Sequence, residues 1–159
     1  MKSRINVFEK GSAAMKVLYG LGAYLSKSPI EKNLLELIYF RVSQINGCAF
    51  CLDMHSKDLR AKGESEQRLF VLDAWREAPF YSERERAALA WAEAVTKING
   101  GQVQDDVYAE ARQQFSDEEL IDLTIAVIAI NSYNRINIAF PNPHAVGTYQ
   151  PGQFAVHAN

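Results

Sequence analysis

The chain has 159 residues, of which 48% are hydrophobic and 23% charged, and its formal net charge is −2. A chain of this length and composition can bury a hydrophobic core as one domain without disulfides or a metal. Because the charges nearly balance, electrostatics give no reason to expect a nucleic acid or an anionic membrane as a partner, and small molecules or other proteins remain.

The apolar segments of the sequence predict neither an export signal nor a membrane span. The first of them, residues 15–25, is interrupted by Lys16 and is not followed by a small-residue cleavage site. The longest apolar run, residues 123–130, is far shorter than the roughly 20 residues that cross a bilayer. We therefore expect a cytoplasmic protein, in which the reducing thiol pool keeps isolated cysteines as thiols.

The first third of the chain predicts an arm and two helices. Residues 1–12 lack periodicity and are expected to form an arm, whereas residues 13–25 have the apolar spacing of a weak helix. Ser28-Pro29-Ile30-Glu31 offers a serine N-cap, a proline at the first helical position and the glutamate of a capping box. This pattern predicts a helix that begins at Pro29 and ends at Asn46-Gly47, a pair that suits a left-handed C-cap.

Both cysteines fall at the start of the next predicted helix, residues 48–61. A helix N-terminus presents unpaired amides and a partial positive charge, which stabilise a thiolate. On a helix, Cys48, Cys51 and His55 occupy neighbouring turns of one face. Glu36 is the lone carboxylate in the apolar run of the preceding helix. A C-x-x-C pair closes only a tiny loop, so it indicates redox or metal chemistry rather than a structural disulfide.

The remaining segments also predict helices. Residues 69–75 form a short one that Ala78-Pro79 breaks, and Ser82 with Glu85 opens a longer one that ends at residues 99–101. A modest helix is expected over residues 103–115.

The most apolar helix is expected over residues 120–137, opened by the capping box of Ser116 and Glu119, and we expect it to be central. No segment alternates like a strand. The sequence therefore predicts an all-α, single-domain helical bundle over residues 1–159, with a core over about 13–140 and an irregular tail over 141–159.

The spacing E-x11-C-x2-C-x3-H of Glu36, Cys48, Cys51 and His55 resembles the catalytic core of the alkylhydroperoxidase AhpD family, within the carboxymuconolactone decarboxylase superfamily. The segments RVSQINGCAFCLDMHSK, ERAALAWAEAVT and INSYNRINIAF look like signatures of the same family. The resemblance covers roughly residues 30–140.

This resemblance implies an all-helical, AhpD-like fold that assembles into homo-oligomers, namely trimers or multiples of trimers. It implies a thiol-dependent peroxidase of the alkyl hydroperoxide reductase type that serves antioxidant defence and uses neither a cofactor nor a metal. Cys51 would be the peroxidatic cysteine, Cys48 its resolving partner, and Glu36 with His55 a proton relay. Its partners would be a peroxide and an external dithiol or protein reductant. In one departure, Phe50 stands where the best-known members carry a second histidine.

The positions of the four motif residues also bear on the role of each. The helix terminus favours Cys48 as the thiolate, but His55 lies one turn from Cys51 and two from Cys48, so we favour Cys51. In an apolar helix, the Glu36 carboxyl is expected to be partly desolvated, with a raised pKa. The alternative is that it simply points to the surface.

Two other functions and a purely structural role for the cysteines stay open. A lyase of the carboxymuconolactone decarboxylase type is one alternative, although decarboxylation has no evident need of a dithiol. Another is a non-catalytic oligomeric protein that keeps the motif for redox or metal binding, since all four residues are acceptable zinc ligands. The two cysteines could also be small buried hydrophobes. Outside the motif, polar residues are expected at the surface or as core and subunit contacts: His144, His157, Asn131, Asn134 and Arg135.

Overall fold

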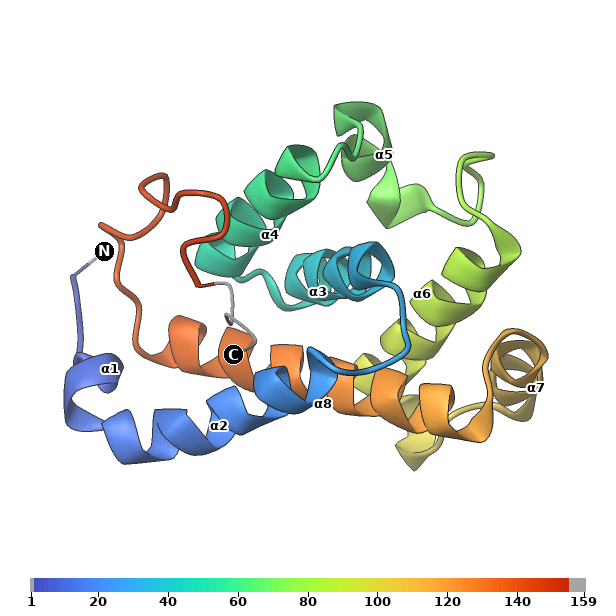
Figure 1. Cartoon of the computed structure of the whole chain (residues 1–159), viewed down its shortest axis with the longest axis horizontal. Coiled ribbons are helices and arrows are strands. Elements are labelled where there is room, and N and C mark those ends of the chain that lie inside the picture. The colour runs from blue at the N-terminus through green and yellow to red at the C-terminus, as the bar shows by residue number, and fades with distance from the viewer. Residues whose placement is uncertain (1, 155–159) are drawn as a thin grey trace.

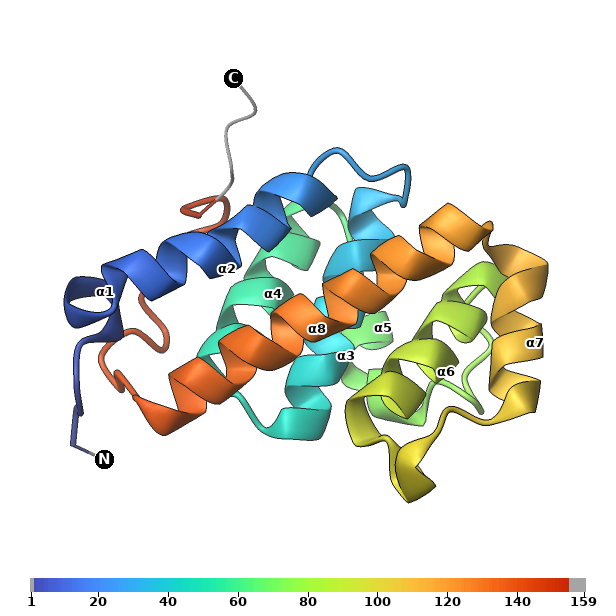
Figure 2. The same cartoon turned by 90° about the horizontal axis from the view of Figure 1, so that it is seen from below.

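Helix α8 (Asp117–Ala139) is the element against which most other helices pack in the computed structural model, which describes residues 2–154 (Figures 1 and 2). Over these residues the chain is helical and contains no strand, which confirms the predicted all-α class. The other elements are α1 (Val7–Lys10), α2 (Ser12–Leu25), α3 (Lys32–Asn46), α4 (Ala49–Ala61), α5 (Glu66–Phe70), α6 (Glu83–Lys97), α7 (Asp105–Gln114) and the 3₁₀ turns η1 (Leu72–Ala74) and η2 (Asn99–Gly101).

Helix α3 occupies the middle of the molecule, with α4, α6 and α8 around it (Figure 1). Its residues Leu37, Ile38 and Val42 are buried, as are Leu123 and Val127 of α8. Removing such side chains from water is the main favourable term in folding. Helix α8, which was predicted to be central, packs against most of the other helices, whereas α3 lies in the middle of the molecule.

Within the described residues, no helix combines the length and the apolar character that crossing a bilayer requires.

Three helix boundaries agree with the capping residues predicted from the sequence. Ser82 with Glu85, and Ser116 with Glu119, form complete capping boxes at the starts of α6 and α8. Gly47 ends α3 in the left-handed conformation, with φ of 68°, which glycine adopts at little cost. The helix expected over residues 69–75 is instead divided between α5 and η1.

The predicted start of α3 at Pro29 is wrong by three residues. Helix α3 begins at Lys32, and the hydroxyl of Ser28 donates to Asp122 Oδ2 at 2.5 Å. Ser28 Oγ does accept from the amide of Ile30, but at 3.3 Å and outside the helix. The buried carboxylate of Asp122 needs hydrogen-bond partners, and this long-range demand outweighs the local capping pattern.

The two ends of the chain depart from the sequence prediction in one respect. Within the expected arm, Val7–Lys10 forms α1, which the side chain of Asn6 caps. After α8, residues 141–154 contain no helix, as expected for the tail, and they turn back to lie along α4 (Figure 1). His144 is exposed, in agreement with its expected surface position, whereas His157 and the rest of residues 155–159 lie outside the described residues.

Candidate active site

The turn between α3 and α4 places the two cysteines against the core. Gly47 reverses the chain, so that α4 packs against α3. Cys48 is the N-cap residue of α4, and Cys51 lies in its first turn. Both are free thiols, and each is only 1% exposed. The predicted position of the pair at the start of a helix is therefore confirmed to within one residue.

The two thiols differ in acidity. A hydrogen bond from the Cys51 thiol to Cys48 lowers the pKa of Cys48 most, and the backbone amides of Cys51 and Phe50 and the Asn134 side chain add to it. Although burial opposes ionisation, the pKa of Cys48 falls to about 7. The same hydrogen bond, together with burial, raises the pKa of Cys51 well above its usual range. Cys48 is therefore the thiol that ionises first, as the helix terminus alone would favour.

Two asparagines of α8 border the thiol pair. Asn134 is fully buried; it donates to Ser43 Oγ at 3.0 Å and accepts from Asn46 at 2.8 Å. Asn137 donates towards Cys51 Sγ at 3.6 Å. The sequence analysis expected Asn134 as a satisfied core group, which it is, but it did not connect either asparagine with the cysteines. Their separation of three residues on one helix face was the available signal.

His55 and Glu36 form a buried pair next to the thiols. His55 Nδ1 lies 2.9 Å from Glu36 Oε2, and Lys62 Nζ lies 3.0 Å from the other oxygen, Glu36 Oε1. The Nε2 atom of His55 is buried and has no hydrogen-bond partner within the described residues. With its hydrogen on Nδ1, directed at the carboxylate, the neutral ring offers Nε2 as a free proton acceptor.

The electrostatics of Glu36 differ from the sequence expectation. Its side chain is 19% exposed, so the expected desolvation is present and by itself raises the carboxyl pKa. The hydrogen bond and charge of His55, followed by those of Lys62, outweigh burial and hold the pKa of Glu36 below its usual value. The prediction of a raised pKa is wrong because it considered burial alone: it did not include the effect of His55, the expected relay partner, on the Glu36 pKa, and it missed Lys62.

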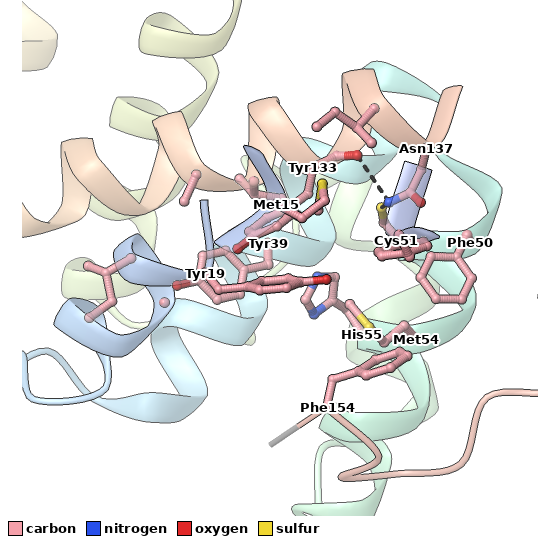
Figure 3. A pocket seen from close by; sticks show the side chains of 16 residues that line it. Met15, Tyr19, Tyr39, Phe50, Cys51, Met54, His55, Tyr133, Asn137 and Phe154 are labelled. Atoms are coloured by element: carbon pink, nitrogen blue, oxygen red, sulfur yellow. Dashed lines mark hydrogen bonds between the residues drawn. The ribbon is translucent and has the colours of Figure 1, made fainter. Parts of the chain in front are cut away.

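A cavity of about 600 Å³ opens beside Cys51 and His55 (Figure 3). Side chains of α2, α3, α4 and α8 form most of its wall, and Phe154 of the C-terminal segment closes one side (Figure 3). Cys48 is not among the described residues that line it. The lining is mainly apolar and aromatic: Phe8, Met15, Tyr19, Gly22, Leu25, Tyr39, Phe50, Cys51, Met54, His55, Ala129, Ile130, Tyr133, Ile136, Asn137 and Phe154.

Three tyrosines, Tyr19, Tyr39 and Tyr133, are among the polar residues that line this cavity. The ring of Tyr39 lies 5.3 Å from the His55 ring. Burial raises the pKa of Tyr133 to about 12, and burial together with the charge of Glu36 raises the pKa of Tyr39. Both phenols therefore stay protonated near neutral pH and can donate hydrogen bonds to a bound molecule.

The residues expected as alternative zinc ligands do not form one cluster. Within the described residues, the possible ligand atoms that lie within 4.8 Å of one another belong to Glu36, His55 and Asp58, and neither cysteine is among them. Lys62 already pairs with Glu36, and the hydroxyl of Tyr149 donates to Asp58 at 2.8 Å. An ammonium and a phenol therefore occupy the carboxylate oxygens that a cation would need.

Comparison with known proteins places these features in a family. Residues 12–94 match the sequence model of the carboxymuconolactone decarboxylase family. The uncharacterized protein YdfG of Bacillus subtilis is 43% identical, over 89% of this chain and 97% of its own length. Alkyl hydroperoxide reductase AhpD of Nocardia farcinica is 39% identical, over 41% of this chain and 40% of its own.

A solved structure extends the similarity to the whole fold. A protein of unknown function from Agrobacterium tumefaciens, suggested to be an antioxidant defence protein AhpD, superposes with a TM-score of 0.84. It is 43% identical, and the alignment covers 94% of this chain and 99% of that one.

Proposed function

The chain belongs to the carboxymuconolactone decarboxylase family, and from this premise and the geometry of the cavity we propose that it is a thiol-dependent peroxidase. It would reduce an organic hydroperoxide in antioxidant defence and draw electrons from an external dithiol or a protein reductant. The name of the Nocardia relative, an alkyl hydroperoxide reductase, supports this reaction class.

One observation carries the proposal. Cys51 and His55 line the same apolar cavity from successive turns of α4, and the buried Nε2 of His55 has no hydrogen-bond partner among the described residues (Figure 3). A thiol and a proton-transferring group beside one apolar cavity are what peroxide reduction requires. Because Cys51, and not Cys48, lines the cavity, Cys51 is the sulfur that would contact the substrate. Cys48 is hydrogen-bonded to it outside the cavity lining.

The first chemical step oxidises Cys51 and reduces the peroxide. In the reactive state Cys48 has given its proton to Nε2 of His55, so the pair is a thiolate and an imidazolium. The Cys51 proton then moves along the existing hydrogen bond to the Cys48 thiolate while the Cys51 sulfur attacks the terminal oxygen of the peroxide. A sulfur–oxygen bond forms, the oxygen–oxygen bond breaks, and the leaving alkoxide takes a proton from Nε2 of the His55 imidazolium. Glu36, which is ionised because its pKa is lowered, stabilises that imidazolium.

The second step forms the disulfide. Cys48 passes its proton to the now neutral His55, and its sulfur attacks the sulfenic acid on Cys51. The hydroxide that leaves accepts the proton back from His55 and becomes water. In total, one peroxide and two thiols give one alcohol, one disulfide and one water, and the external dithiol then restores both thiols.

A thiol count in a single turnover tests the proposal. One equivalent of cumene hydroperoxide should remove two thiols per chain and leave an intramolecular disulfide in the mass spectrum. The variant Cys48→Ser, which lacks the thiolate that takes the Cys51 proton, should react more slowly and stop as a sulfenic acid on Cys51, which dimedone captures. Cys51→Ser should not consume peroxide. Unchanged thiols after peroxide addition would exclude the reaction, and dimedone capture on Cys48 at the wild-type rate would reassign the nucleophile.

The lyase alternative receives no support from the cavity. A cyclic lactone acid carries carboxylates, and the described residues that line the cavity include neither lysine nor arginine to bind them. The dithiol would also stay unused in a decarboxylation.

A further inference from the structure

The C-terminal strap, which we define as residues 147–154, is held on α4 by polar contacts. The backbone amide of Gly147 donates to Asp53 Oδ2 at 2.9 Å. Lys57 Nζ donates to the carbonyl of Tyr149 at 3.1 Å. Asp58 accepts twice, from the hydroxyl of Tyr149 at 2.8 Å and from the amide of Gly152 at 2.9 Å.

These anchoring residues lie on the helix that carries the catalytic residues. Asp53, Lys57 and Asp58 alternate along α4 with Cys51 and His55. A helix is rigid over this length, so the position of the strap relative to the thiol is defined by one element. The strap thus belongs to the architecture of the site, although the sequence pattern of this segment predicted only a tail.

Phe154 brings the strap into the cavity. Its ring lines the cavity of Cys51 and His55 and lies 6.4 Å from the Phe50 ring and 5.6 Å from the Tyr149 ring (Figure 3). Tyr149 is buried and anchors the strap, whereas Phe154 remains 59% exposed. A ring that stays this exposed contributes little to core burial, and its contacts in the structure are with the cavity and with Phe50 and Tyr149.

Phe154 also stands between two unlike spaces. With Met54 and His55 it lines a second hollow of about 410 Å³, whose other residues include Glu36, Asp58 and Lys62. The first cavity is apolar and the second carries charges. The Phe154 ring therefore covers the apolar space on the side from which water and ions would reach it.

We infer that Phe154, together with Phe50, is a specificity-determining residue of this site and selects hydroperoxides with a bulky apolar group over hydrogen peroxide. This inference rests on the proposed peroxidase function. An aromatic or branched group gains contact with both rings and with the apolar wall, whereas hydrogen peroxide has no surface to place against them. Of these two rings, the strap supplies Phe154 and α4 supplies Phe50.

The test compares Phe154→Ala and Phe154→Leu with Phe70→Ala, a matched control in which an exposed phenylalanine outside the cavity lining is removed. The first measurement is the ratio of kcat/KM for cumene hydroperoxide to that for hydrogen peroxide. The second is the dissociation constant of the alcohol product, 2-phenyl-2-propanol, from the reduced protein, followed by NMR shifts of cavity residues. This second measurement needs no turnover.

We expect Phe154→Ala to lower the kcat/KM ratio and weaken alcohol binding by about five- to twentyfold, in the range for lost apolar contacts in a pocket. Phe154→Leu should recover part of both, and Phe70→Ala should match the wild type. If the ratio and the dissociation constant are unchanged in Phe154→Ala, the inference is overturned. A wild type that reduces neither peroxide would refute the proposed function, while alcohol binding would still report on Phe154.

Discussion

At the scale of single residues, the carboxylate of Glu36 lies between Lys62 and His55, the second of which lines the cavity. Lys62, half-exposed on the far side, contacts one oxygen, and His55, buried on the near side, contacts the other. Because both partners stabilise the carboxylate, Glu36 stays ionised to lower pH than a free glutamate. In the proposed reaction, the His55 imidazolium would keep its counter-ion over the same range.

The substitution Lys62→Met tests this arrangement. It removes one of the groups that lower the Glu36 pKa, so that this pKa should rise towards its ordinary value. We expect the acid limb of the kcat/KM profile to move to higher pH, with little change at pH 8. A carbon-13 NMR titration of the Glu36 carboxyl measures the same shift directly.

The variant Glu36→Gln gives the limit of this effect. It removes the charge with little change of shape, and a rate loss on the order of 10²-fold is expected for a lost acid–base partner.

The lowered pKa of Glu36 also makes the stability of the fold depend on pH. Because the folded value lies below the unfolded one, the ionised pair stabilises the fold above the unfolded pKa, and this contribution is lost as the pH falls through the folded value. Acid limbs that coincide in Lys62→Met and the wild type would contradict the role of Lys62.

How much of the site could be predicted from the sequence depends on the distance along the chain. Cys48, Cys51 and His55 share one helix, so their common face follows from helical geometry. Asn137 and Phe154 reach the same cavity from segments more than 80 residues away, and no local pattern connects them with the cysteines. From the sequence, Lys62 was recognised only as a residue at the end of a helix and not as a partner of Glu36.

At the scale of elements, the helices opened by capping boxes were predicted well where the serine had no competing partner. Ser82 and Ser116 face solvent and cap their own helices. Ser28 has the same sequence pattern, but its hydroxyl is taken by Asp122, 94 residues later. The start of α3 was mispredicted because the hydrogen bond to the buried carboxylate of Asp122 holds the Ser28 side chain against α8, where its oxygen accepts from the amide of Ile30 outside the helix.

Substituting these serines should therefore have different consequences. Ser116→Ala removes an exposed cap and should cost about 1 kcal/mol of unfolding free energy. Ser28→Ala leaves the buried oxygen Asp122 Oδ2 without that donor and should cost about 1–3 kcal/mol. Urea denaturation of both variants gives the two values.

A double-mutant cycle then identifies the partner of Ser28. If the structure is right, Ser28→Ala and Asp122→Ala are coupled by about 1 kcal/mol, because they remove the same hydrogen bond. Independent, additive effects would restore Ser28 to the role of a simple helix cap.

At the scale of the whole molecule, the outer faces of α2 and α8 expose apolar residues in line. Val17 and Tyr24 lie seven residues apart on α2, and Ile121 and Ile128 lie seven apart on α8. Residues seven apart fall on one face of a helix, so these side chains form two neighbouring apolar stripes. We propose that they are covered by further copies of the chain in a trimer or a multiple of one.

Light scattering of the purified protein measures this directly. The expected mass is a multiple of three chains of 17.9 kDa each, and Val17→Asp combined with Ile121→Asp should lower it. Phe70→Asp, at an exposed position on α5, serves as the control with unchanged mass. A stable monomer at micromolar concentration would rule out the proposed assembly.

The near-complete burial of both sulfurs has a consequence for the lifetime of the oxidised protein. A thiolate that reduces the disulfide must reach one sulfur along the disulfide axis, and each sulfur belongs to a residue that is 1% exposed. A reductant as large as a protein therefore has to wait until the chain opens locally. If the proposed peroxidase function holds, reduction would be independent of reductant concentration above a low threshold, and the oxidised chain would retain, for as long as one opening takes, a record of the peroxide that it met.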